Sequence, residues 1–95
     1  MAATLSPTST VQRSEEQIAA SVDDEIIILS VERGSYFGLD DIGSDIWERL
    51  ANPIRVDALC DALAAEYDAD RAMIERDVLA LLGKLLAAGL VSAAP

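Results

Sequence analysis

The side chains that could carry out chemistry in this sequence are almost all carboxylates. The chain has 17 Asp and Glu residues, 7 Lys and Arg residues and no histidine among its 95 residues. Catalytic triads and most zinc sites therefore lack their usual member. Asp40 and Asp41 fall where a helix cap is expected, and Asp23, Asp24 and Glu25 are adjacent rather than alternating, unlike a calcium loop. We expect no catalytic residue, no metal site and no cofactor.

Charge and cysteine content narrow the possible partners and the compartment. The net charge of −10 repels phosphate groups, so we expect neither nucleic acid nor an anionic membrane surface as a partner. Charged residues interrupt every long apolar run, which predicts no membrane span, and no signal sequence is recognisable. The single cysteine, Cys60, falls between Leu59 and Leu63 in an apolar stripe, as a buried thiol does. Together these features favour a cytoplasmic protein.

The first half of the chain contains the strand signals. Residues 1–15 are small and polar and predict a flexible tail, followed by one domain over residues 16–92. Strands are expected at 18–22, 25–31 and 35–39, with a tight turn at 32–35. The continuous apolar run at 25–31 indicates a strand that is covered on both faces, or one whose second face meets a partner.

The second half predicts three helices, at about 41–50, 55–67 and 71–88. In the first of them Ile42, Ile46, Trp47 and Leu50 recur on one face and should belong to the core. Strands that precede helices indicate an α+β fold, with a three-stranded antiparallel sheet followed by three helices in a winged helix-turn-helix-like arrangement.

The most distinctive stretch is Tyr36–Leu50, with an aromatic strand that ends in Leu39 and a helix that contains Ile46 and Trp47. With Asp77-Val78 and Gly89-Leu90-Val91 it resembles the PqqD-like family over about residues 17–91. Asp40 stands where that family usually has asparagine, and both residues cap helices well. The resemblance implies a protein that is not an enzyme. It would bind the leader segment of a ribosomally made precursor peptide and present it to a separate enzyme, such as a leader peptidase or cyclase, most plausibly in lasso-peptide maturation.

The resemblance and the residues together predict a peptide site between the third strand and the third helix. An extended peptide can add to an edge strand, where main-chain bonds give affinity and side-chain pockets give specificity. On the helix the apolar arc is about 160° wide, more than the roughly 100° that a surface helix needs. A helical wheel with 100° per residue assigns Leu81, Ile74, Leu85 and Val78 to the core side of this arc. The predicted site comprises Ser35, Tyr36, Phe37, Gly38, Leu39, Arg71, Glu75, Val78, Leu79, Leu82 and Leu86. The alternative to this helix flank is the opposite one, which carries Met73, Asp77 and Lys84.

Two other classes of protein fit parts of the sequence. An acyl-carrier-like protein is also small and acidic, but the strand hairpin is foreign to a helix bundle, and Ser44 lacks the sequence setting of a carrier serine. A winged-helix DNA-binding protein would share the fold, but the net charge opposes it.

Overall fold

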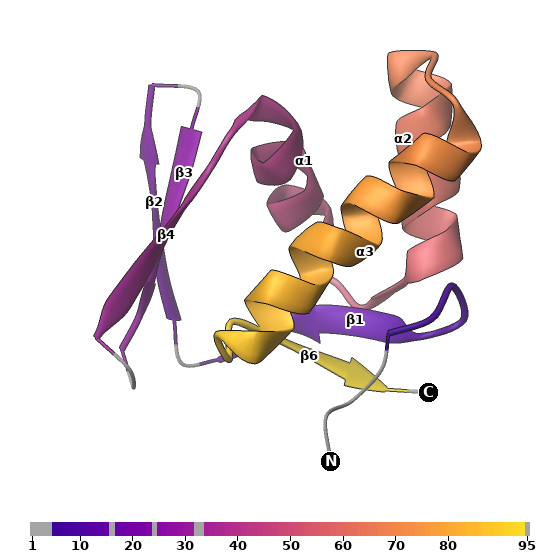
Figure 1. Ribbon diagram of the computed structural model, residues 1–95. Helices are drawn as coiled ribbons and strands as arrows, with labels where there is room; N and C mark the ends of the chain where they lie inside the picture. The colour runs from indigo at the N-terminus through magenta and orange to yellow at the C-terminus, as the bar shows by residue number, and fades with distance from the viewer. Residues whose placement is uncertain (1–4, 16, 24, 32–33, 95) are drawn as a thin grey trace.

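The structure confirms the α+β fold and its winged-helix-like order of elements. The computed structural model describes residues 5–15, 17–23, 25–31 and 34–94. Within these residues a three-stranded antiparallel sheet precedes the helices, and the helices all lie on one side of that sheet (Figure 1).

The three-stranded sheet consists of β2 (Gln17–Val22), β3 (Glu25–Ser30) and β4 (Ser35–Leu39) in the spatial order β2-β3-β4. The predicted turn falls partly on residues 32 and 33, which are outside the described residues. Gly34 has a φ of 65°, which suits glycine, and its N–H donates to the Ser30 carbonyl at 2.9 Å. Among the described strands β4 pairs only with β3, so its other edge is unpaired.

The helices begin and end close to the predicted positions. They are α1 (Asp41–Arg49), α2 (Val56–Tyr67) and α3 (Arg71–Ala87). Asp40 caps α1 by accepting a hydrogen bond from the Gly43 N–H at 2.8 Å. Helix α3 contacts α2 along its side, and α1 lies between these two helices and the sheet (Figure 1).

A second small sheet corrects the prediction of a flexible tail. Strand β1 (Thr10–Arg13) pairs with β5 (Ile54–Arg55) and with β6 (Val91–Ala94), and Val11 is fully buried. The prediction is therefore wrong for residues 10–13. Because both partner strands lie far away in the sequence, four residues without a visible period gave no local sign of the pairing.

Strand β1 is also bound to the first helix. The Arg13 guanidinium lies over the Trp47 ring, with its carbon 4.8 Å from the ring centroid, and donates two hydrogen bonds to the Trp47 carbonyl at 3.0 and 2.6 Å. Partial burial lowers the pKa of Arg13, but the guanidinium stays charged. This contact fixes the small sheet beneath α1.

The core lies between the large sheet and the helices. Its largest fully buried side chains share an apolar character and come from the large sheet, the three helices with the end of α1, and the turn before β6: Trp47, Ile28, Leu50, Leu59, Leu63, Leu82, Leu85 and Leu90. In the described part of the chain no helix is long and apolar enough to cross a membrane.

Candidate functional site

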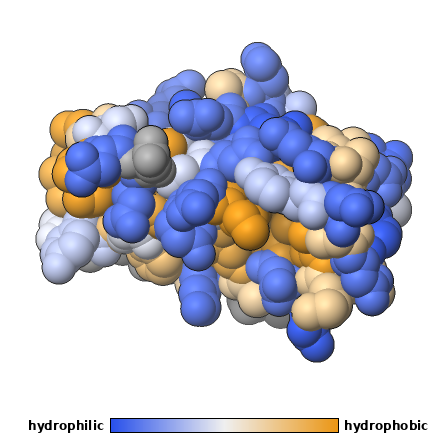
Figure 2. All heavy atoms as spheres, turned by 90° about the horizontal axis from the view of Figure 1, so that it is seen from above, coloured by the Kyte–Doolittle hydropathy of each residue, from blue (hydrophilic) through white to orange (hydrophobic). Residues whose placement is uncertain are grey.

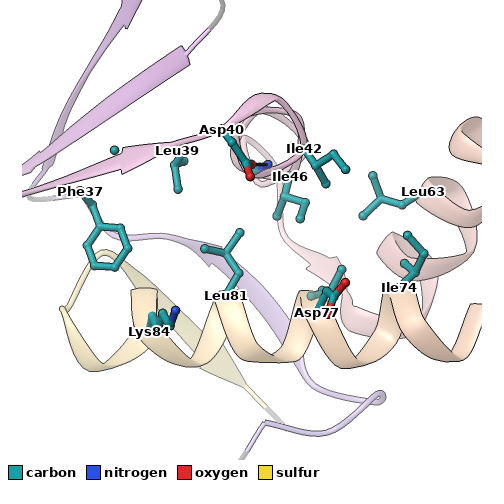
Figure 3. A pocket seen from close by; sticks show the side chains of 13 residues that line it. Phe37, Leu39, Asp40, Ile42, Ile46, Leu63, Ile74, Asp77, Leu81 and Lys84 are labelled. Atoms are coloured by element: carbon teal, nitrogen blue, oxygen red, sulfur yellow. Dashed lines mark hydrogen bonds between the residues drawn. The ribbon is translucent and has the colours of Figure 1, made fainter.

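A groove of about 400 Å³ opens between the edge strand β4 and helix α3 (Figure 3). Helix α1 forms its end wall, and α2 contributes one side chain. Most of the lining is apolar, and the residues are Phe37, Gly38, Leu39, Asp40, Ile42, Gly43, Ile46, Leu63, Ile74, Asp77, Val78, Leu81 and Lys84. Its size is in the range that ligand sites in proteins commonly have.

The wall formed by α1 is held close to the sheet by hydrogen bonds between the Ser44 side chain and the backbone of two strands. Ser44 is buried, and its hydroxyl accepts a hydrogen bond from the Ile26 N–H at 3.0 Å and donates one to the Leu39 carbonyl at 3.3 Å. A Cβ on Gly43 would lie 3.1 Å from Asp40 Oδ1 and 3.3 Å from the Leu39 Cβ. Glycine at position 43 therefore permits a close approach of the helix to the strand.

Helix α3 is held against α2 by polar contacts of Arg71, the first residue of the helix. Arg71 donates to Asp61 at 2.7 Å, to Glu75 at 3.1 Å and to the Asp57 carbonyl at 3.4 Å. The hydrogen bond to Asp61 raises the pKa of the Arg71 guanidinium above its usual value. Arg71 and Glu75 were predicted in the site, but neither lines the groove. Arg71 joins α3 to α2, and Glu75 pairs with Arg71 on the same helix.

The flank of α3 that lines the groove is the opposite of the predicted one. Leu82 is fully buried in the core, and Leu79 and Leu86 are partly buried and pack against that core. The groove instead receives Ile74 and Leu81, which the helical wheel assigned to the core side. The assignment of Val78 and Leu85 to the core is confirmed, whereas Ile74 and Leu81 are partly buried, pack against the core and also line the groove.

The strand side of the site agrees better with the prediction. Phe37, Gly38 and Leu39 line the groove, as does Val78 on the helix. Tyr36 does not, because successive side chains point to opposite faces of a sheet and Tyr36 is exposed on the other face. The backbone of Ser35 pairs with Ser30 at the start of the same strand.

Several groove residues were missed or misplaced by the sequence reasoning. Ile42 was assigned to the core, yet it is 44% exposed and stands at the end wall of the groove. Asp77 and Lys84 lie on the same helix flank as Ile74 and Leu81. Residues 74, 77, 78, 81 and 84 follow helical spacing, so two charged residues within one apolar stripe were the available signal that this stripe is open to solvent.

The groove combines an apolar floor with charges of both signs at its rim. Asp40 and Asp77 supply carboxylates, and Lys84 supplies an ammonium group further along α3 (Figure 3). The nearest cation to Asp77 is Arg76 at 3.8 Å, a long and exposed ion pair. Such a site suits an extended chain with apolar anchors and scattered polar groups.

The described residues hold no group of three or more His, Cys, Asp or Glu side chains arranged to bind a metal ion. Cys60 is fully buried, and this burial raises the pKa of its thiol. The chemistry that this site offers is therefore binding by main-chain pairing and apolar contact.

Comparison with known proteins finds a matching family and relatives, two of which are described in complexes with leader peptides. The family described as coenzyme PQQ synthesis protein D (PqqD) matches residues 25–91. A relative from Rhodopseudomonas palustris, named PqqA binding protein, is 41% identical over 68 residues, which make up 72% of this chain. The same region makes up 65% of that protein, so this chain spans about two thirds of the relative's length.

Three solved structures share the fold. TbiB1 in complex with the TbiA(β) leader peptide is 38% identical, with a TM-score of 0.79, and the match covers 85% of this chain and 94% of that one. Lasso peptide synthetase B1 complexed with the leader peptide is 28% identical, with a TM-score of 0.75 and coverage of 90% and 98%. The PqqD truncation of Methylobacterium extorquens PqqCD, described as a stand-alone RiPP recognition element, has a TM-score of 0.78 and coverage of 93% and 94%. At 22% identity it supports the fold alone.

Proposed function

The chain belongs to the PqqD family of non-catalytic peptide-binding proteins, and we propose that it binds the leader segment of a ribosomally synthesised precursor peptide as an added strand on β4. It then presents the bound precursor to a separate processing enzyme, such as a leader peptidase or cyclase.

The observation that carries this proposal is an unpaired strand edge beside an apolar groove. In an edge strand every second residue turns its N–H and C=O toward the unpaired side, where an incoming strand can bond to them. The side chains of an added strand alternate between the two faces, so one set points toward the floor formed by Ile74, Val78 and Leu81. Main-chain bonds would set the register of the leader, and these apolar contacts would select its sequence.

The descriptions of the relatives support leader-peptide binding independently of the groove. TbiB1 and lasso peptide synthetase B1 are both described in complexes with leader peptides, and the relative from R. palustris is named for binding PqqA. The comparisons support neither an acyl-carrier-like protein nor a winged-helix DNA-binding protein.

For the pathway we propose lasso-peptide maturation, because lasso peptide synthetase B1 matches this chain over 90% of its length and 98% of its own. A pathway of the PQQ type is the second candidate, since the PqqA binding protein has the higher identity of 41%. Measuring the affinity of the chain for a lasso precursor leader and for PqqA, side by side, distinguishes the two. Tighter binding of PqqA would reverse the order.

The groove is tested by exchanging the two flanks of α3. Leu81→Glu places a charge in the groove, whereas Leu79→Glu places the same charge on the flank away from it. Fluorescence anisotropy with a labelled leader should show at least about tenfold weaker binding for Leu81→Glu and less than about twofold change for Leu79→Glu. Urea unfolding of both variants verifies that they fold. The reverse order of effects would move the site to the flank first predicted.

The strand addition itself is tested on the peptide, which leaves the protein unchanged. A leader that is N-methylated at single amides loses one main-chain donor at each position. Strand addition predicts that methylation weakens binding at every second residue and has little effect at the residues between them. A uniform response along the leader would contradict an added strand.

A further inference from the structure

The outer face of the large sheet is an exposed apolar surface. The sheet register aligns Ile18, Leu29 and Tyr36 in one row across all three strands, and they are 58%, 41% and 75% exposed. The next row contains Ala20, Ile27 and Gly38. We name these six residues the outer face. The second row carries less side-chain volume than the first, because it contains alanine and glycine. A Cβ on Gly38 would have no neighbour within 4 Å, so the surface is open there.

Nothing in the described part of the chain covers this face. The helices and the small sheet all lie on the opposite side of β2, β3 and β4 (Figure 1). In the view from above, apolar atoms reach the surface at the sheet end of the molecule (Figure 2). They form a group separate from the apolar atoms in the middle of this view. Contiguous apolar patches are uncommon on proteins that act alone and mark contact sites.

The outer face is continuous with the proposed leader site. Both surfaces meet at β4, where Phe37 and Leu39 face the groove side, while Tyr36 and Gly38 belong to the outer face. A leader strand added to β4 would direct its other set of side chains onto the outer face, beside Tyr36. The apolar surface would then extend by one strand, and only in the leader-loaded protein.

The charges of the chain favour a different protein over a second copy as the occupant. Two copies at −10 each repel one another. Glu25, which pairs with Val22 in the register, continues the outer face at one end and is exposed, as is Asp23. A partner with an apolar patch and basic residues around it complements this surface in both respects.

We propose that the outer face is the docking surface for the processing enzyme, which recognises it together with the bound leader. This inference rests on the proposed function and extends it, because it assigns the second partner to a surface distinct from the leader groove. The enzyme contributes an apolar patch with a basic rim. Docking on a surface completed by the leader favours the loaded protein over the empty one.

The test uses the purified leader peptidase of the pathway and the full precursor. Mass spectrometry measures how much wild-type protein accelerates precursor cleavage. Leu29→Lys and Ile18→Lys should reduce that acceleration at least about tenfold, because each places a charge in the apolar centre. Leu29→Thr keeps the net charge and strand propensity, and should reduce it by a smaller factor in the same direction.

The matched control is Ser21→Lys, which adds the same charge to the same strand as Ile18→Lys but on the opposite face. It should change cleavage and leader affinity by less than about twofold. Leader affinity of Leu29→Lys and Ile18→Lys should also stay within about twofold, which verifies that they fold. Equal acceleration by all variants would overturn this inference alone. A wild-type protein that fails to bind the leader would instead contradict the proposed function.

Sedimentation of the wild-type protein tests the competing occupant of the outer face, which is a second copy of this chain. A monomer is expected with and without leader. A wild-type dimer that Leu29→Lys dissociates would assign the outer face to a second copy and overturn the docking proposal.

Discussion

The two faces of strand β3 carry the same kind of side chain in opposite surroundings. On the inner face Ile26 and Ile28 are 7% and 0% exposed, whereas on the outer face Ile27 and Leu29 are 37% and 41% exposed. The inner face packs against the helices, and the outer face has no covering element among the described residues (Figure 1).

This difference shows that residue type alone does not decide burial. A run of four apolar residues was compatible with a strand covered on both faces or with one that offers a face to a partner. The structure excludes cover from the described part of this chain on the second face. The apolar side chains there stabilise the monomer less than their partners on the inner face, as is expected of the docking surface that we propose.

The largest expected effect comes from truncating one isoleucine on each face. Ile28→Ala should destabilise the protein by about 2–5 kcal/mol, because it leaves a cavity in a packed core. Ile27→Ala should cost less than about 1 kcal/mol, mainly through lower strand propensity. Urea unfolding followed by circular dichroism measures both values. Similar losses for the two variants would mean that the outer face is covered in solution.

A smaller effect tests the polar contact that holds α1 on the inner face. Ser44→Ala removes the acceptor of the buried Ile26 N–H and should lower the free energy of unfolding by about 1–3 kcal/mol. Leader binding should weaken as well, since α1 forms the end wall of the groove. Ser21→Ala, on an exposed strand, is the control and should change stability by less than about 0.5 kcal/mol. An unchanged Ser44→Ala variant would show that the contact contributes little.

The features that were predictable from sequence are those set by neighbours along the chain. The α1 cap at Asp40 and the turn glycine at Gly34 depend on a few adjacent residues, and the structure confirms both. The backbone conformation at a helix cap or a tight turn restricts strongly which residue types can stand there.

The features that were not predictable depend on which distant elements meet. Val11 is buried because β5 and β6 arrive from elsewhere in the chain. On α3, apolar residues extend around so much of the helix that the pattern could not decide which flank packs in the core. Contact with α2 and the sheet decided it, burying Leu82 and leaving Leu81 at the groove.

The smallest expected effect concerns Tyr67, an exposed aromatic residue that has a polar partner, unlike the outer face. Tyr67 lies at the end of α2, and its hydroxyl donates to Asp45 on α1 at 2.7 Å. This hydrogen bond raises the pKa of Tyr67 from 10.0 to about 12. The folded state therefore holds the phenolic proton more tightly than the unfolded state does. The stabilisation is complete below pH 10 and is lost as pH rises through about 12.

Tyr67→Phe removes both the hydrogen bond and the titrating group. At neutral pH the variant should be slightly less stable than the wild type, because the lost contact is exposed to solvent. Between pH 10 and 12 the wild type should lose this advantage, so that the urea midpoints of the two proteins converge. Parallel midpoints across that interval would show that the Asp45 contact does not persist in solution.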